Sequence, residues 1–427
     1  MRHASSLVTS TGRRALMRRV HALGREVGGG RAVVSYFHQA DDPYSHLVCQ
    51  VLGRFAERYD VELKVWLVSP PDDGAAPERD KLRRYGLRDA RVVARKRGLG
   101  FPATTELPNT DAIAAAKAVL VHALAQGSFV ERAPDLSSAL WSGCQILGPE
   151  EDVASALAAG DAERERLGHY LGGMFYFEGE WYWGLDRLGY LEQRLAALGL
   201  DRDAGAPMIA PFIDPVLAPV TTAPGPLVIE VWFSFRSPYS WLVMPRIREL
   251  AQHYGAELKL RFILPMVMRG LPIPKAKGRY IVFDCKREAE REQLPFGKIV
   301  DPVGAGAERA LAVLHHAIPL GLGEQWSELA LRGAWADGLA LAEEKDLYEI
   351  AHRAGLTDAQ IAAALADDGW RSVAEQNRAE LFEAGLWGAP TFRVNGGTAH
   401  WGQDRLWALE DDMHALLTNA REGEPAA

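Results

Sequence analysis

The chain has 427 residues, of which 48% are hydrophobic and 24% are charged, and its formal net charge is −8. This length exceeds what one hydrophobic core usually serves, so we expect two or more domains. The negative net charge argues against the large basic surface that is typical of a nucleic-acid-binding protein. No apolar run approaches the ~18–20 residues that span a bilayer. We therefore expect neither nucleic acid nor a membrane as a partner.

Residues 1–30 form a basic extension whose segment "RRALMRRVHALGREV" predicts an amphipathic helix. The segment lacks the apolar core and the small-residue cleavage site of a secretory signal. A mitochondrial transit peptide is one interpretation of its arginine content. A helix that packs on the first domain is the interpretation we favour, with a cytoplasmic location. The arginines of this extension are Arg2, Arg13, Arg14, Arg18, Arg19 and Arg25.

The chain contains an internal repeat. When the sequence is shifted by 195 residues, residues 32–67 align with residues 227–262 without a gap, and 11 of these 36 positions are identical. The two repeats also end alike, with "MFYFEGEWYWGLDRL" from Met174 and "TFRVNGGTAHWGQDRL" from Thr391. A repeat of this length indicates two related domains, which we place at residues 31–200 and 227–420. Residues 201–226 between them are rich in Pro and Ala, the composition of a semi-rigid linker.

Each repeat reads as a strand, a helix, a strand, a long helical stretch, a hairpin and a final helix. The run "LVIEVWF" at residues 227–233 is continuously apolar, as in a strand buried on both faces. Asn395-Gly396-Gly397 marks the turn of the hairpin. This order of elements predicts an α/β fold with two thioredoxin-like domains, each a central sheet with an inserted helical subdomain. Helical spacing in the second insertion covers 311–318, 329–341 and 347–354.

The stretch "SPYS" at residues 237–240 follows the first strand of the second repeat. Redox proteins of this fold place Cys-x-x-Cys where the first strand leads into the next helix, a junction that we call the corner. Both cysteine positions are serines here. Ser237 suits the helix N-cap and Pro238 the first helical position. The free N–H groups and the dipole of the helix favour negative charge at this point. The corner could therefore stabilise a thiolate that a ligand brings in, with the Ser237 hydroxyl as the hydrogen-bond donor.

The second repeat resembles the kappa-class glutathione transferases and the 2-hydroxychromene-2-carboxylate isomerases of the DsbA-like superfamily. The resemblance covers residues 227–413 and rests on "SPYSWL", "KAKGRY", "LPFG", "GLWGAPTFRVNG" and "WGQDRL". It implies a glutathione-dependent isomerase or transferase that acts on a small aromatic electrophile. It also implies that Ser237 contacts the glutathione sulfur, that Ala389 precedes a cis proline, Pro390, and pairs with the peptide, and that Gln403 and Asp404 hold the γ-glutamyl end. Tyr239 joins these glutathione-binding candidates, although its recurrence as Tyr44 favours a packing role.

The first repeat departs from the pattern at the positions that would face the ligand. Asp42 stands where the second repeat has Ser237, and its charge would repel a thiolate. Gly173 aligns near Pro390, and Leu185 replaces Gln403. We interpret the first domain as a degenerate copy that forms an intramolecular pseudo-dimer with the second.

The cysteines and histidines give little support for a disulfide or a metal site. The three cysteines are far apart, which predicts reduced, buried thiols and excludes a Cys-based zinc site. His315 and His316 have no ligand cluster at metal spacing, so we expect no metal. Two alternatives stay open: a DsbA-type protein without a redox dithiol, and a non-enzymatic scaffold that binds a peptide or protein beside Pro390. The loop at residues 265–278 lacks the asparagine that the resembled family often carries, which favours the scaffold.

Overall fold

The computed structural model describes residues 6–104, 106–219 and 225–422, so Arg2 lies outside the described residues. The chain divides into two compact units. We call them the N-terminal unit, Arg14–Phe212 with Pro274–Tyr280, and the C-terminal unit, Met1–Arg13 with Ile213–Ile273 and Ile281–Ala427. The boundary between Phe212 and Ile213 falls inside the Pro/Ala-rich segment.

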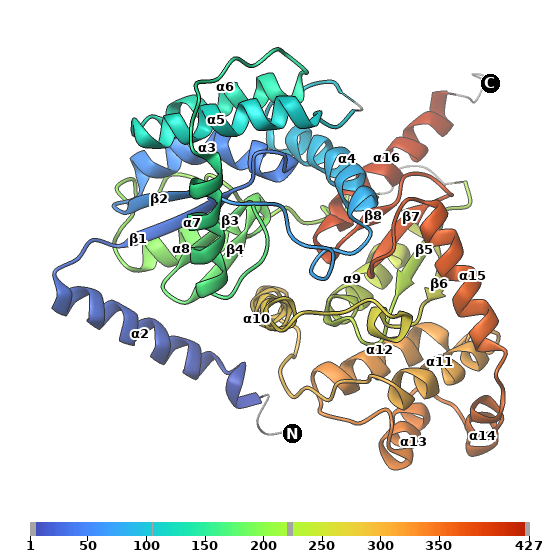
Figure 1. Ribbon diagram of the computed structural model, residues 1–427. Coiled ribbons are helices and arrows are strands. Elements are labelled where there is room, and N and C mark those ends of the chain that lie inside the picture. Colours follow the sequence, from blue (N-terminus) through green and yellow to red (C-terminus); the bar gives the residue numbers. More distant parts are fainter. Residues whose placement is uncertain (1–5, 105, 220–224, 423–427) are drawn as a thin grey trace. The chain divides into compact units, whose positions relative to one another are not determined.

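Each unit contains one four-stranded mixed sheet, and the two sheets have the same topology (Figure 1). The strand orders are β2-β1-β3-β4 and β6-β5-β7-β8. In each sheet the first two strands pair in parallel and the hairpin strands pair antiparallel. The strands are β1 (Val33–His38), β2 (Glu62–Leu67), β3 (Met174–Phe177), β4 (Glu180–Trp183), β5 (Val228–Phe233), β6 (Glu257–Phe262), β7 (Thr391–Val394) and β8 (His400–Trp401).

The hydrophobic pattern explains which strands are central. Five of the six residues of β1 and of β5 are buried, as expected of apolar strands covered on both faces. The outer strands β2 and β6 share one partly exposed burial pattern. Val33 pairs with Glu62, and Val228 with Glu257, so the strand register repeats at the 195-residue shift. The predicted fold class, two thioredoxin-like domains with inserted helices, is confirmed.

Helices of the N-terminal unit fill the connections of its sheet (Figure 1). Helix α3 follows β1 directly, and the helices between β2 and β3 form the insertion. The insertion consists of α4 (Arg79–Arg97), α5 (Thr110–Ala125), α6 (Phe129–Trp141) and α7 (Val153–Arg166). The other helices are α2 (Thr11–Gly28) before β1, α3 (Pro43–Arg58) between β1 and β2, and α8 (Gly184–Ala197) after β4.

The C-terminal unit has a larger helical insertion between β6 and β7, and its core includes the buried Trp241 and Trp326. The predicted helix at 329–341 is too long, because α12 ends at Trp335 before a turn in which Gly338 has a φ of 77°. No helix in the described ranges is long and apolar enough to cross a membrane. The helices are α9 (Pro238–Tyr254), η1 (Met266–Arg269), α10 (Lys275–Arg291), α11 (Ala305–Ala317), α12 (Gly323–Trp335), α13 (Glu344–Arg353), α14 (Asp358–Ala366), α15 (Trp370–Glu383), η2 (Gln403–Arg405) and α16 (Leu406–Glu422).

Two buried glutamates, one in each unit, bind the backbone of the Pro/Ala-rich segment. On α8, buried Glu192 accepts hydrogen bonds from the backbone N–H groups of Ile209 (2.7 Å) and Ala210 (2.9 Å). On α16, buried Glu410 accepts from those of Val216 (2.6 Å) and Leu217 (2.7 Å). The described part of this segment is therefore anchored at both ends, which its composition did not predict.

Two sequence predictions concern surface features. Helix α2 contacts the first domain as expected, because Arg18 pairs with Glu180 at 2.5 Å and Arg25 pairs with Glu178. The prediction of buried thiols holds for Cys49 and Cys285 and is wrong for Cys144. Cys144 is exposed because it lies in the loop after α6, beyond the last helical residue that packs.

Candidate functional site

Ser237 begins helix α9 at the carboxyl end of the central strand β5. It is the N-cap residue, and its Oγ accepts a hydrogen bond from the Ser240 backbone N–H at 3.3 Å. Pro238 follows at the first helical position, where its missing N–H costs nothing. Ser237 is half-buried, so its hydroxyl can still be reached from outside the core. The predicted cap is confirmed.

The Ser237 hydroxyl meets the loop before β7. Its Oγ donates a hydrogen bond to the Ala389 carbonyl at 3.0 Å, and the Ala389–Pro390 peptide bond is cis, as expected. The preceding residue must be glycine, since a Cβ on Gly388 would lie 2.3 Å from the Trp401 ring. This close packing fixes the loop against the hairpin. The structure thus brings Ser237 next to the Ala389–Pro390 pair, although Ser237 and Ala389 are 152 residues apart in the chain.

Tyr239 has a partner inside the unit. Its hydroxyl donates to Asp284 Oδ2 at 2.8 Å, and Arg287 donates to the other carboxylate oxygen at 2.6 Å. The N-terminal unit repeats the contact, with Tyr44 donating to Asp89 at 2.7 Å. A contact present at both corners fits the packing interpretation of Tyr239, and its role toward glutathione stays a prediction.

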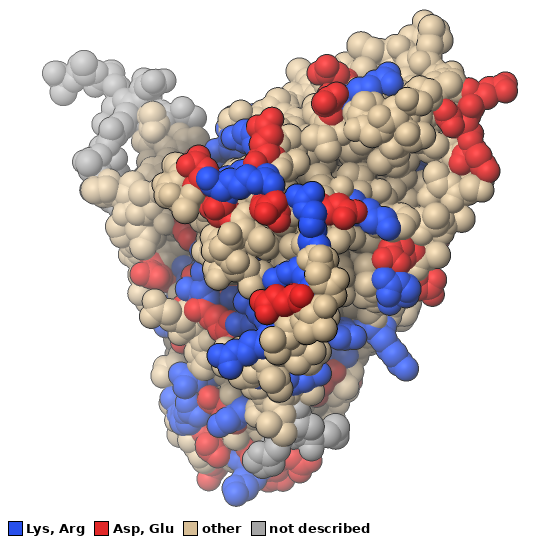
Figure 2. Space-filling model, turned by 90° about the vertical axis from the view of Figure 1, so that its left-hand side faces the viewer, with Lys and Arg blue, Asp and Glu red and all other residues tan. Residues whose placement is uncertain are grey.

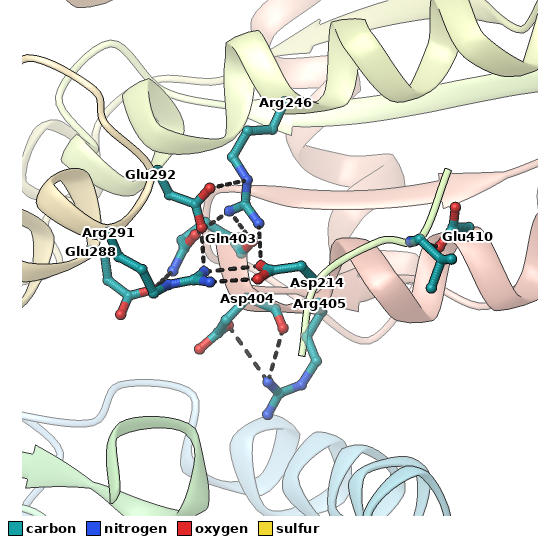
Figure 3. Close-up of polar contacts among 10 residues, drawn as sticks. Asp214, Arg246, Glu288, Arg291, Glu292, Gln403, Asp404, Arg405 and Glu410 are labelled. Atoms are coloured by element: carbon teal, nitrogen blue, oxygen red, sulfur yellow. Dashed lines mark hydrogen bonds and ion pairs between the residues drawn. The ribbon is translucent and has the colours of Figure 1, made fainter. Parts of the chain in front are cut away.

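The Gln403 side chain is buried within a network of charged groups (Figure 3). Its Nε2 donates to Glu288 at 2.6 Å, and its Oε1 accepts from Arg246 at 2.7 Å. Both ends of this amide are thus occupied by α10 and α9. Any contact of Gln403 with a ligand would require its backbone or a rearrangement, and the predicted glutathione role stays a prediction.

Asp214, from the Pro/Ala-rich segment, extends the same network (Figure 3). Its carboxylate accepts from Arg246 at 3.1 Å and from Arg291 at 2.5 Å. Burial alone would raise the pKa of Asp214, but the two arginines outweigh it and hold that pKa below its ordinary value. Sequence reasoning missed Asp214, because nothing near it in the chain marks it as a neighbour of Gln403.

Asp404 is the predicted ligand residue with the more accessible side chain. Its carboxylate keeps 22% exposure and lies 3.7 Å from the guanidinium of Arg405, which is itself buried. Its neighbour Gly402 has a φ of 115°, and Gly402 donates its N–H to the Pro390 carbonyl at 3.0 Å. The start of η2 is therefore tied to the same cis-proline loop that accepts a hydrogen bond from Ser237.

The corresponding corner of the N-terminal unit is built differently. Asp42 caps α3 and accepts from both the N–H and the hydroxyl of Ser45 at 2.8 Å. Burial raises the pKa of Asp42 to about 6. Gly173 takes the place of Pro390, because Gly184 donates to its carbonyl at 2.8 Å. A Cβ on Gly173 would lie 3.0 Å from Asp42 Oδ2, so this loop lies directly against the carboxylate.

A buried polar cluster beneath that corner escaped the sequence analysis. Tyr36 Oη lies 3.2 Å from His38 Nδ1, and His46 Nδ1 lies 2.9 Å from Ser137 Oγ. Burial lowers the pKa of His38 to about 3 and that of His46 to about 4, so both rings are neutral. The signal was available, since Val231, Phe233 and Trp241 stand at the aligned positions of the second repeat.

Comparisons with known proteins agree with the fold. Residues 228–414 match the family model of the DSBA-like thioredoxin domain. The chain is 23% identical over 201 residues to a 2-hydroxychromene-2-carboxylate isomerase of Pseudomonas sp. (strain C18), a match that covers 45% of this chain and 93% of that protein. The isomerase of Pseudomonas putida gives 23% over 198 residues, covering 44% and 96%.

Solved structures of lower similarity include a 2-hydroxychromene-2-carboxylate isomerase, with 21% identity and a TM-score of 0.40 over 46% of this chain and all of that one. The cytosolic disulfide reductase DsbM from Pseudomonas aeruginosa with GSH gives 18% identity and a TM-score of 0.34, over 46% of this chain and 99% of that one. Each match covers less than half of the present chain. The family match over residues 228–414 places a DsbA-like thioredoxin domain in the C-terminal unit, and the two Pseudomonas isomerases are homologues at low identity.

Proposed function

We propose that the C-terminal unit is a glutathione-dependent isomerase or transferase that acts on a small aromatic electrophile. The observation that carries the proposal is the Ser237 hydroxyl, half-buried at a helix N-terminus and 3.0 Å from the carbonyl before the cis Pro390. The isomerase names of two curated relatives support the same reaction class. We infer in addition that the two units are copies of one ancestral domain, and that the N-terminal copy lacks this chemistry.

The residues at the corner fit the sulfur end of a glutathione molecule. Bound there, glutathione would supply a thiolate nucleophile that adds to an electrophilic carbon, permits rotation about the former double bond and leaves again. Ser237 would redirect its proton from the Ala389 carbonyl to the sulfur, and the N-terminus of α9 would stabilise the negative charge. The Ala389 backbone would pair with the peptide.

The γ-glutamyl end would depend mainly on Asp404. A carboxylate is the natural partner of the ligand's ammonium group, and Asp404 is the predicted residue at this end whose side chain is partly exposed. Gln403 would act through its place in the network with Arg246 and Glu288, which fixes the start of η2. We therefore expect the loss of Asp404 to weaken glutathione binding more than the loss of the Gln403 carboxamide alone.

Titration calorimetry with glutathione, followed by turnover of a 2-hydroxychromene-2-carboxylate, tests the proposal. Ser237→Ala removes a hydrogen bond to a charged atom, worth ~1.5–3 kcal/mol, so turnover should fall by about tenfold or more. The matched control is Asp42→Ala, which removes the equivalent cap of the N-terminal unit and should leave glutathione affinity unchanged. Unchanged turnover in Ser237→Ala would remove the serine from the mechanism.

A thiol–disulfide oxidoreductase is the main competing enzyme class. Disulfide exchange needs a thiolate, and serine or aspartate occupies the N-cap of both corners. We expect no reduction of insulin by the protein in the presence of dithiothreitol beyond the uncatalysed rate. Catalysed reduction that survives Cys144→Ser would contradict the proposed function.

A peptide-binding scaffold without activity is the remaining alternative. The occupied amide of Gln403 favours it, because the protein itself uses a group that the resemblance assigns to glutathione. Calorimetry separates the two proposals. A folded protein that gives no heat with glutathione at millimolar concentration would favour the scaffold.

A further inference from the structure

Helix α2 carries an exposed apolar stripe. Leu16, Val20, Leu23 and Val27 are 54–89% exposed, and none of the described side chains of this helix is buried. Their spacing of four, three and four residues places all four on one side of an α-helix. Exposed aliphatic side chains that occur singly are ordinary, but a continuous stripe marks a contact surface.

The helix binds its own unit with the opposite, charged face. Arg18 donates two hydrogen bonds to the Glu180 carboxylate, and Arg25 pairs with Glu178. His21, on the same face, lies next to Gly179. This hairpin between β3 and β4 therefore holds α2 in the orientation that directs the stripe outward. Because the helix is already held in place, a partner would not bear the full entropic cost of forming it.

We propose that the stripe pairs with the same stripe of a second copy of this chain, as an antiparallel helix pair. Leucine and valine alternate at the spacing of a two-stranded coiled-coil seam. In an antiparallel pair about an axis midway between His21 and Ala22, Leu16 lies opposite Val27 of the second copy and Val20 lies opposite Leu23. Every apolar residue of the stripe then has an apolar partner, and the contact closes with two-fold symmetry.

The charges beside the stripe fit the same arrangement. Arg19 and Glu26 border it on one side, and both are exposed. The antiparallel pairing places Arg19 of each copy next to Glu26 of the other, which gives two ion pairs. A parallel pairing would place Arg19 next to Gly24 and would pair no charges. The self-complementary order of charges therefore selects the antiparallel form.

An anionic membrane surface is a weaker candidate for the same stripe. Interfacial helices use a basic polar face to bind lipid headgroups, whereas here Arg18 and Arg25 pair with glutamates of the hairpin. On the face shown in Figure 2, basic and acidic side chains are interspersed rather than gathered by sign. The mixed charges on this face therefore fit a second copy of the chain better than a uniformly negative membrane surface.

The expected dimer is weak. Stable protein–protein interfaces bury about 1,200–2,000 Å² in total, and a stripe of four aliphatic side chains per chain supplies less. We therefore expect a monomer–dimer equilibrium that responds to protein concentration in the micromolar range. Sedimentation velocity of the full chain from about 1 to 200 µM measures it.

Charge reversal gives the sharp test, because it leaves the apolar stripe intact. Arg19→Glu alone and Glu26→Arg alone each turn two attractions into repulsions, and each should weaken dimerisation roughly fivefold to a hundredfold. The double variant restores opposite charges and should regain dimerisation to within about threefold of the unmodified chain. Leu23→Lys should abolish the dimer. Circular dichroism checks that every variant keeps its helices.

Three outcomes would overturn the proposal. The first is a chain that stays monomeric to 200 µM. The second is a dimer that Leu23→Lys leaves intact, which would place the interface elsewhere. The third is a monomer that co-sediments with phosphatidylglycerol vesicles but not with phosphatidylcholine vesicles, which would make an anionic membrane the partner. Failure of the glutathione experiments would leave this proposal untouched, because the stripe from Leu16 to Val27 lies in the N-terminal unit.

Discussion

Ser237 and Asp42 cap equivalent helices and differ in what they can offer a visiting anion. The serine presents a hydroxyl that now donates to the Ala389 carbonyl and could donate to a thiolate. The aspartate accepts two hydrogen bonds from Ser45 and has no proton to give when it is ionised. The two side chains thus preserve the cap but give the corners opposite preferences for charge.

The buried histidines of the N-terminal unit should make it sensitive to acid. Their pKa values, about 3 for His38 and about 4 for His46, lie below the ordinary value of about 6.5. Protonation therefore favours the unfolded chain, and stability is lost as the pH falls below about 6.5. Each histidine should cost ~2 kcal/mol between pH 7 and pH 5. Asp42, whose pKa is raised to about 6, should return ~1 kcal/mol over the same range.

Urea unfolding at pH 7 and pH 5 measures this effect. The full chain should lose ~2–3 kcal/mol of unfolding free energy at the lower pH. His46→Gln keeps a side chain able to bond Ser137 and the Gly100 carbonyl but cannot titrate. This variant should lose ~2 kcal/mol less than the unmodified chain between the two pH values. An equal loss in both proteins would show that His46 does not carry the effect.

At the level of single residues, the sequence predicted the helix cap and the hairpin turn, which local geometry decides. A Ser-Pro pair after a strand defines an N-cap, and Asn395-Gly396 defines a turn in which both residues have positive φ values. The occupied state of Gln403 was out of reach, because its partners Arg246 and Glu288 are 157 and 115 residues away. No local pattern encodes such a contact.

Among the elements, the last helix of each unit carries a buried glutamate with one shared task. Tyr59 donates to Glu192 at 2.9 Å, and Tyr254 donates to Glu410 at 2.8 Å. Each carboxylate also accepts two backbone N–H groups of the Pro/Ala-rich segment. In both units a tyrosine at the C-terminal end of the helix after the central strand, α3 or α9, therefore contacts a carboxylate that also binds the Pro/Ala-rich segment.

The composition of residues 201–226 predicted a linker but did not predict that a buried glutamate of each unit binds it. Proline and alanine indicate a stiff, extended segment, and they say nothing about which N–H groups are free to bind. The regular elements were easier to predict, because apolar runs and hairpin glycines act locally. The end of α12 was missed for the opposite reason, since apolar residues continue past Trp335 in a turn that Gly338 makes possible.

Replacement of Glu410 or Glu192 by glutamine tests whether these carboxylates hold the Pro/Ala-rich segment. Glu410→Gln replaces one accepting oxygen with an NH₂ group that would face a backbone N–H, so we expect a loss of ~1–3 kcal/mol. Hydrogen exchange should quicken at Val216 and Leu217 and stay unchanged at Ile209 and Ala210. Glu192→Gln is the matched control and should give the reverse pattern. Equal exchange in all three proteins would mean that the carboxylates do not hold the segment.

For the whole molecule, the question is why a domain without the serine corner is retained. Two related domains on one chain could pair with each other within the same molecule. A short connection gives the two copies a high effective concentration, on the order of millimolar. A partner needed only for packing could then lose its ligand-facing residues, as Asp42, Gly173 and Leu185 suggest.

We therefore expect the C-terminal unit to depend on its neighbour. The fragment 213–427 keeps Val216 and Leu217, which complete the contacts of Glu410, and it lacks only the short N-terminal segment of its unit. If the N-terminal unit covers an apolar face of this fragment, the isolated fragment should self-associate or precipitate at micromolar concentration. Addition of the separately expressed fragment 6–212 should restore a soluble one-to-one complex, measured by light scattering after size exclusion. A fragment 213–427 that is monomeric and as active as the full chain would instead make the N-terminal unit an independent module.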